Sequence, residues 1–76
     1  MTTYEIVEEA LGRLDSAKGE VILDLSPVSR IDSRGLRALE NLTATAGAKG
    51  VQVALRGVNV DVYKVLKLAN LKWLPM

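Results

Sequence analysis

A carboxylate and a hydroxyl stand next to each other at Asp32 and Ser33, where the pattern predicts that a helix begins. Either side chain can accept a hydrogen bond from the first turn of that helix as its N-cap, which is worth about 1 kcal/mol. The backbone N–H groups and the dipole at a helix start also tolerate an anion such as phosphate. Ser33 is therefore a candidate phosphorylation site. A phosphate there would add up to about two negative charges and would expel a bound partner without refolding the domain.

The residues around Ser33 form a candidate binding surface for another protein. Its members are Asp24, Asp32, Ser33, Arg34, Gly35 and Arg37. Gly35 lies in the first helical turn and is expected to leave the backbone open to an approaching molecule, while the nearby arginines, Arg30 included, are expected to form a rim. The alternative is purely structural: Asp32 or Ser33 caps the helix, and the arginines are solvated surface charge.

The composition argues against catalysis and metal binding. The chain has no cysteine and no histidine, so it lacks thiol nucleophiles, the usual zinc ligands and the usual general base near neutral pH. Asp24 and Asp32 are expected to lie near each other, yet a small domain offers little cavity in which to shift their pKa values. The sequence also lacks a phosphate-binding loop of the Gly-x-x-x-x-Gly-Lys type. We expect no enzyme activity, no cofactor and no metal.

Length and charge indicate one small globular domain, residues 1–76. Its residues are 49% hydrophobic, which excludes disorder, and the net charge is only +1. Scattered lysines with few aromatic side chains do not make a nucleic-acid surface. No signal peptide and no membrane span are visible, so a cytoplasmic location without direct membrane insertion is expected.

Helices and strands alternate in the order helix, strand, helix, strand, helix. Thr2 and Glu5 have the spacing of a capping box ahead of a first helix, whose apolar residues recur at helical spacing as far as Leu14. The apolar run Val21–Leu25 predicts a strand of the kind that lies in the centre of a parallel sheet. Apolar and other residues alternate over Val51–Arg56, which predicts a strand with one buried face and one face that is at best half-covered.

The remaining elements complete an α/β pattern. A second helix is expected over about Ser33–Ala46, and Asn59 is expected to cap a third. Asn70 suits the left-handed position that ends a helix, and one more short strand is expected within Leu71–Leu74. Strands that alternate with helices pair in parallel through right-handed crossovers. The predicted fold class is therefore α/β.

Several of these segments together resemble the signature of the STAS domain. They are Val21–Ser26, Val28, Ile31–Leu36, Gly50–Leu55, Gly57–Asn59 and Val65–Leu71. The resemblance covers roughly Ile6 to Leu74, and the family includes bacterial anti-sigma factor antagonists and the cytoplasmic domains of sulfate transporters. It implies a small STAS-like domain whose work is protein–protein interaction.

Our main expectation from this resemblance is an anti-sigma factor antagonist. In that branch an anti-sigma kinase phosphorylates the serine that corresponds to Ser33, and Asp24 and Asp32 match the acidic positions that flank it. The unphosphorylated protein sequesters the anti-sigma factor and so frees the sigma factor. The resemblance thus implies that transcription is regulated through a phosphorylation switch.

Two alternatives stay open. Asp24–Ser26, Val28–Arg30, Gly57–Asn59 and Asn70–Leu71 also resemble the small STAS subunit of bacterial phospholipid-transport ABC systems. There the domain clamps the ATPase subunit, and the hydroxyl at the position of Ser33 lies in the contact. The second alternative is a nucleotide-binding regulator, because some relatives have been proposed to bind nucleotide.

The chain departs from the family pattern at its start and beside Ser33. The family begins with two strands and a Gly-x-Leu-Asp turn ahead of its first helix, whereas this chain starts at that helix. Such a truncated domain is expected to leave one sheet edge bare, with Ile22 and Ala54 on an uncovered face. We expect a homodimer, or a sheet completed by a partner. Arg34 stands where antagonists have a small residue.

Overall fold

The computed structural model describes residues 2–71 and 73–75. Helices and strands alternate as predicted, and the fold class is α/β. The elements are α1 (Thr3–Leu11), the short 3-10 helix η1 (Leu14–Ser16), β1 (Glu20–Asp24), α2 (Ser33–Ala48), β2 (Gln52–Arg56), α3 (Val60–Ala69) and β3 (Leu74–Pro75). The last of these confirms a short final strand, although Lys72, part of the expected segment, lies outside the described residues.

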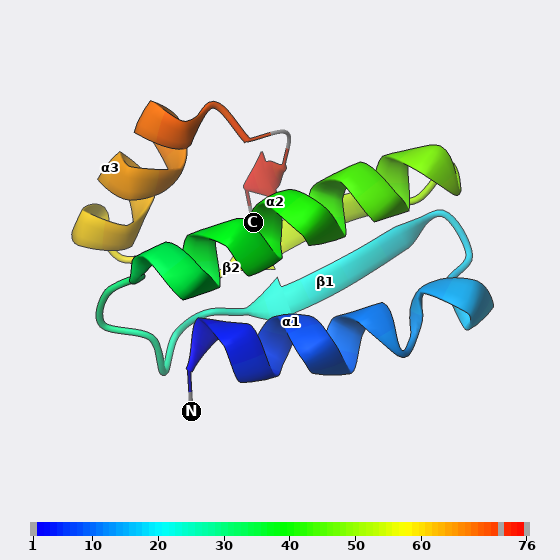
Figure 1. Cartoon of the computed structure of the whole chain (residues 1–76), viewed down its shortest axis with the longest axis horizontal. Coiled ribbons are helices and arrows are strands. Elements are labelled where there is room, and N and C mark those ends of the chain that lie inside the picture. The colour runs from blue at the N-terminus through cyan, green and yellow to red at the C-terminus, as the bar shows by residue number, and fades with distance from the viewer. Residues whose placement is uncertain (1, 72, 76) are drawn as a thin grey trace.

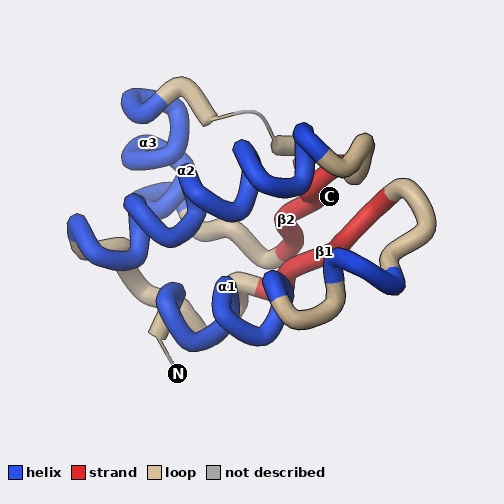
Figure 2. Tube along the Cα trace, turned by 45° about the vertical axis from the view of Figure 1, so that its right-hand side comes forward, coloured by secondary structure: helices blue, strands red, loops and turns tan. Residues whose placement is uncertain are grey.

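The three strands form one parallel sheet in the order β1-β2-β3. Glu20 pairs with Gln52 and Asp24 with Arg56, so β1 and β2 match along their whole length. Figure 1 shows α1 and α2 running alongside β1 and β2, and the turned view of Figure 2 shows both helices on the same side of these strands. Within the described residues β1 lies at one end of the strand order and β2 lies between β1 and β3, although the apolar run of β1 is typical of a central strand.

The core lies between the two helices and the sheet. Val21 and Leu23 of β1 point into it, as do Val53 and Leu55 of β2. The largest fully buried side chains are Leu23, Leu25, Leu39, Leu42, Leu55, Leu66, Val7 and Val62. Because the chain has no phenylalanine, these branched aliphatic side chains supply most of the apolar burial that drives folding.

The ends of the helices follow the residues that the sequence offers. Thr2 and Glu5 form the expected capping box at the start of α1, and Asn70 adopts the left-handed conformation, with φ 57°, at the end of α3. The first helix is shorter than its apolar pattern suggests, because it ends at Leu11 with Gly12 as C-cap. Leu14 is still buried, but within η1.

The second face of the sheet is only partly bare. Ile22 is 44% exposed, as expected, whereas Ala54 is only 1% exposed, so the expectation for Ala54 is wrong. Ala54 lies on the central strand, where it is in register with Ile22 on one side and with Leu74 on the other. The small side chain of Ala54 is therefore flanked by a paired strand on each side.

Candidate docking site at the start of α2

Asp32, not Ser33, is the N-cap of α2. Its backbone is extended, with φ −86° and ψ 176°, and its Oδ1 accepts a hydrogen bond of 2.8 Å from the backbone N–H of Gly35. Ser33 is then the first helical residue, and its side chain is exposed. No hydrogen bond of the Ser33 hydroxyl is found within residues 2–71 and 73–75. The hydroxyl is therefore free to meet a partner.

The first turns of α1 and α2 lie at the same end of the molecule, where β1 and β2 finish (Figure 1). Thr2 and Thr3 from the start of α1 and Asp32 from the start of α2 line one pocket of about 270 Å³ there. Each helix presents unpaired N–H groups and the positive end of its dipole at this place. Both helix starts are already capped by a carboxylate, Glu5 in α1 and Asp32 in α2.

A groove of about 510 Å³ runs between α1 and α2 beside Ser33. Its lining residues are Tyr4, Val7, Glu8, Leu11, Ser33, Arg34, Arg37, Ala38 and Asn41. The structure therefore brings three of the proposed binding residues, Ser33, Arg34 and Arg37, to one groove. Two arginines against a single glutamate make this groove net positive.

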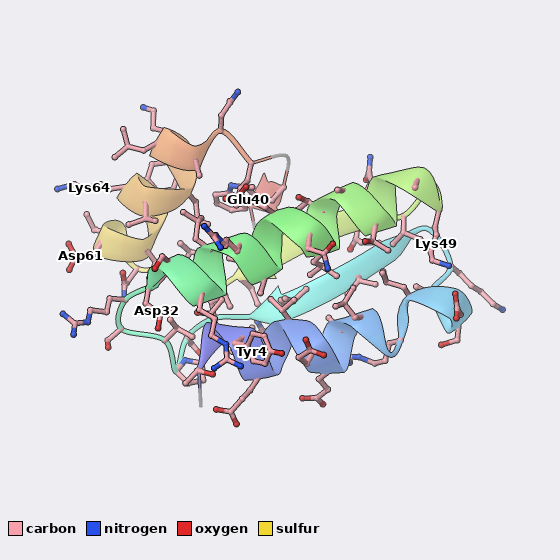
Figure 3. All side chains as sticks on the ribbon, viewed as in Figure 1. Tyr4, Asp32, Glu40, Lys49, Asp61 and Lys64 are labelled. Atoms are coloured by element: carbon pink, nitrogen blue, oxygen red, sulfur yellow. The ribbon has the colours of Figure 1, made fainter. Side chains whose placement is uncertain are left out.

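The guanidinium of Arg34 lies over the ring of Tyr4, 3.9 Å from the ring centroid. Such a cation–π contact at a surface contributes roughly 0.5–1 kcal/mol and holds the cation in one position. Figure 3 labels Tyr4 on α1 and Asp32 at the start of α2. Sequence reasoning missed Tyr4, because no local pattern links a residue of the first helix to an arginine thirty positions later.

Gly35 does not leave the site open. It is buried, and a Cβ atom added to it would lie 3.0 Å from Cβ of Thr3 and 3.2 Å from Oδ1 of Asp32. The glycine instead lets the first turn of α2 approach the first turn of α1. The expectation that a partner reaches the backbone through Gly35 is therefore wrong, because Thr3 occupies that space.

Asp24 lies apart from the groove. Its carboxylate accepts a hydrogen bond of 2.9 Å from the backbone N–H of Ser26, and it lines a pocket with Pro27 and Ile22. Hydrogen bonds from the Ser26 hydroxyl and backbone, with the charge of Arg56, lower the pKa of Asp24. The structure thus gives Asp24 a turn-forming contact at the end of β1. Arg30 likewise lines the pocket of Thr2 and Asp32, and not the groove.

The loop that leads into α2 is held by Asn59. The Asn59 side chain accepts a 2.8 Å hydrogen bond from the Val62 N–H as the expected cap of α3. Its Nδ2 also donates to the carbonyl oxygens of Val28 and Ser29, both at 3.1 Å. These two bonds were not foreseen from the sequence, and they fix the loop from which Asp32 and Ser33 follow.

Within residues 2–71 and 73–75 there is no group of three or more histidine, cysteine, aspartate or glutamate side chains placed to hold a metal ion. Among the same residues no helix is long and apolar enough to cross a bilayer.

The cap geometry leads to a stability prediction. Replacing Asp32 with alanine removes the acceptor for the Gly35 N–H and is expected to lower the free energy of unfolding by about 1 kcal/mol. The matched variant Ser33→Ala removes a solvent-exposed hydroxyl and is expected to change it by less than about 0.5 kcal/mol. Urea denaturation followed by circular dichroism measures both; equal losses would show that the two side chains share the cap.

A small parallel α/β domain with an exposed serine at the start of its second helix is the arrangement that the STAS resemblance implied. A family model described as "STAS domain" matches residues 2–75. The chain belongs to the STAS domain family.

Individual relatives refine this result. The chain is 46% identical over 59 residues to the intermembrane phospholipid transport system binding protein MlaB of Escherichia coli (strain K12), and equally so to that of Shigella flexneri. The match covers 78% of this chain and 61% of each relative, so the chain spans about three fifths of their length. The solved NMR structure of the protein TM1081 is 28% identical, with a TM-score of 0.72, over 97% of this chain and 58% of that one. The names of the two MlaB proteins correspond to the phospholipid-transport alternative and not to the anti-sigma factor antagonist.

Proposed function

We propose that this chain is a STAS-type binding subunit of a phospholipid transport system and that it docks on the ATPase subunit of an ABC transporter. The observation that carries the proposal is the 46% identity to proteins named as phospholipid transport system binding proteins. The geometry at the start of α2 supports it, because an exposed hydroxyl lies beside a net positive groove between two helices.

The proposed contact surface consists of Ser33, Arg34, Arg37 and Tyr4, which we call the docking groove. Arg34 and Arg37 can donate hydrogen bonds to acidic side chains of the partner, and the Tyr4 ring supplies apolar contact area. The Ser33 hydroxyl at the end of the groove can both donate and accept. Rigid helices carry all four side chains, so little conformational entropy is lost when the partner binds.

Under this proposal the domain binds and positions its partner and performs no reaction of its own. Its role is to hold the ATPase subunit in an active arrangement. A cytoplasmic location belongs to the same proposal, since the ATPase needs cytoplasmic ATP. Phosphorylation of Ser33, which would place a dianion in the contact, is a further and separate proposal.

Co-expression with the ATPase subunit encoded nearest to this chain tests the proposal. The two proteins are expected to co-elute in size-exclusion chromatography, and the complex is expected to hydrolyse ATP faster than the ATPase alone. In NMR spectra, the amide signals of residues 4–8 and 33–41 should shift on binding, whereas those of α3 should not. Elution as separate species, with unchanged ATP hydrolysis, would contradict it. Binding to an anti-sigma kinase instead would revive the main expectation.

A further inference from the structure

The groove between α1 and α2 contains two arginines that have no acidic partner within the domain. Arg34 and Arg37 lie about one turn apart on α2, and Glu8 follows Tyr4 by about one turn on α1, so all four side chains line the same groove. Among residues 2–71 and 73–75, neither arginine forms an ion pair or donates a hydrogen bond from its side chain. Their N–H donors are therefore available to an acceptor on another molecule.

The Tyr4 ring determines where the Arg34 guanidinium lies. The central carbon of the guanidinium is 3.9 Å from the ring centroid, a distance at which the two groups are in van der Waals contact. The ring face attracts the cation through its quadrupole but supplies no oxygen acceptor for the N–H groups. Arg34 is exposed on the first turn of α2, and an exposed arginine otherwise populates many rotamers. The contact thus holds its planar fork of donors in one place before a partner binds.

Charge and geometry favour a carboxylate as the group that this fork receives. A carboxylate can accept two parallel hydrogen bonds from one guanidinium, and Arg37 brings a second cation to the same groove. Glu8 is the one carboxylate among the residues that line the groove, and its charge opposes an acidic ligand. Removing the charge of Glu8 should therefore strengthen the binding of an acid and weaken the binding of a base.

We propose that Tyr4 is a positioning residue, which holds Arg34 ready to receive a carboxylate side chain of the ATPase subunit, with Arg37 as a second donor to the same acidic group. The inference rests on the proposed function and deepens it, because it assigns the chemistry of the group that enters the groove. Tyr4 acts here through Arg34, in addition to the apolar area that its ring offers to the partner.

The contact between Tyr4 and Arg34 can be tested in the free protein. Because the guanidinium lies over the ring, the NMR signals of the Arg34 Hε and Hδ protons are expected upfield of those of the other exposed arginines. Tyr4→Phe keeps the ring and should keep this shift, whereas Tyr4→Leu should abolish it. Equal chemical shifts for Arg34 in the original chain and in Tyr4→Leu would contradict the positioning role.

Binding of the ATPase subunit, measured by isothermal titration calorimetry, tests the consequence. Tyr4→Leu keeps an apolar side chain but removes the ring, and it should weaken binding by about threefold to tenfold. Tyr4→Phe keeps the cation–π contact and should bind within about twofold of the original chain. Arg34→Lys keeps the charge but loses the planar fork, so it should weaken binding by about threefold or more.

A double variant separates positioning from direct contact. Arg34→Ala should weaken binding by about tenfold or more. If Tyr4 acts through Arg34, adding Tyr4→Leu to Arg34→Ala should change the affinity by less than about twofold. Independent losses, which multiply in the double variant, would overturn the positioning role, because Tyr4 would then contribute by its own contact alone.

The charge of Glu8 tests the chemistry of the group that enters the groove. Glu8→Gln should raise the affinity by about twofold to fivefold, because a like charge beside the incoming carboxylate is removed. Glu9→Gln is the matched control: Glu9 lines a different pocket, with Ile22 and Asp24 of β1, and its substitution should change the affinity by less than about twofold. A lower affinity of Glu8→Gln would show that a cation enters the groove and would overturn the proposal.

Failure of the inference and failure of the proposed function give different results. If the original chain does not bind the ATPase subunit, the proposed function is wrong and the inference falls with it. If the original chain binds, and Tyr4→Leu and Arg34→Lys bind equally well, only the inference is wrong. Circular dichroism checks that each Tyr4 variant is folded, and Arg34→Lys, at an exposed position, provides the test should Tyr4→Leu unfold.

Discussion

Replacing Ser33 with aspartate is expected to weaken binding of the ATPase subunit by at least about tenfold, because the new carboxylate would repel the acidic groups of the partner that Arg34 and Arg37 are proposed to bind. Ser33 is exposed on the first turn of α2 and contributes nothing to the core, so the fold should survive. A carboxylate at this position even suits the positive end of the helix dipole. The unfolding midpoint is therefore expected to stay the same or rise slightly.

The measurement is isothermal titration calorimetry of the ATPase subunit with each Ser33 variant, with urea denaturation of the same samples. Ser33→Thr keeps the hydroxyl and should bind like the original chain, while Ser33→Ala separates loss of the hydroxyl from gain of a charge. Unchanged binding by Ser33→Asp would place the contact elsewhere. Reduced stability with unchanged binding would leave Ser33 with a structural role only.

Gly57→Ala is expected to lower the free energy of unfolding by about 2–5 kcal/mol, from a left-handed backbone and a steric clash together. Gly57 follows β2 with φ 69°, and a Cβ atom there would lie 2.7 Å from Cβ and 2.9 Å from the backbone nitrogen of Ser26. Because the second contact is with backbone, the turn after β1 would have to shift. That turn precedes the loop that leads to α2.

Gly50→Ala is the matched control. Gly50 has nearly the same backbone angle, φ 71°, but a Cβ atom there meets nothing within 4 Å. Its substitution should cost only the left-handed conformation, about 1–2 kcal/mol. The difference between the two variants in urea denaturation isolates the clash with Ser26. Equal losses of unfolding free energy in the two variants would mean that the turn at Ser26 shifts without a measurable energetic cost.

Much of the fold could be predicted because its signals are local. The apolar spacing of α1 and α3, the cap at Asn59 and the left-handed Asn70 each depend on residues within one or two turns. The exposure of Ser33 could also be predicted from the local pattern, because a residue at the start of a helix that follows a loop is seldom covered by other elements.

The errors concern contacts between elements that are distant in the sequence. Gly35 is buried because Thr3 packs against it, and Arg34 is held by Tyr4; both follow from how α1 crosses α2. Ala54 is covered because β2 is the central strand, which depends on the order in which the strands pair. Helical spacing and alternation specify which face of an element is apolar, but not which residues of a neighbour meet it.

The two roles of Asn59 have a mechanical consequence. The side-chain amide of Asn59 caps the first turn of α3 and also donates hydrogen bonds to the carbonyl oxygens of Val28 and Ser29. A ligand that displaces the chain between β1 and α2 must either move α3 as well or break both hydrogen bonds from Asn59 to the carbonyl oxygens. The positions of α3 and of the loop before α2 are thereby linked through the side chain of Asn59.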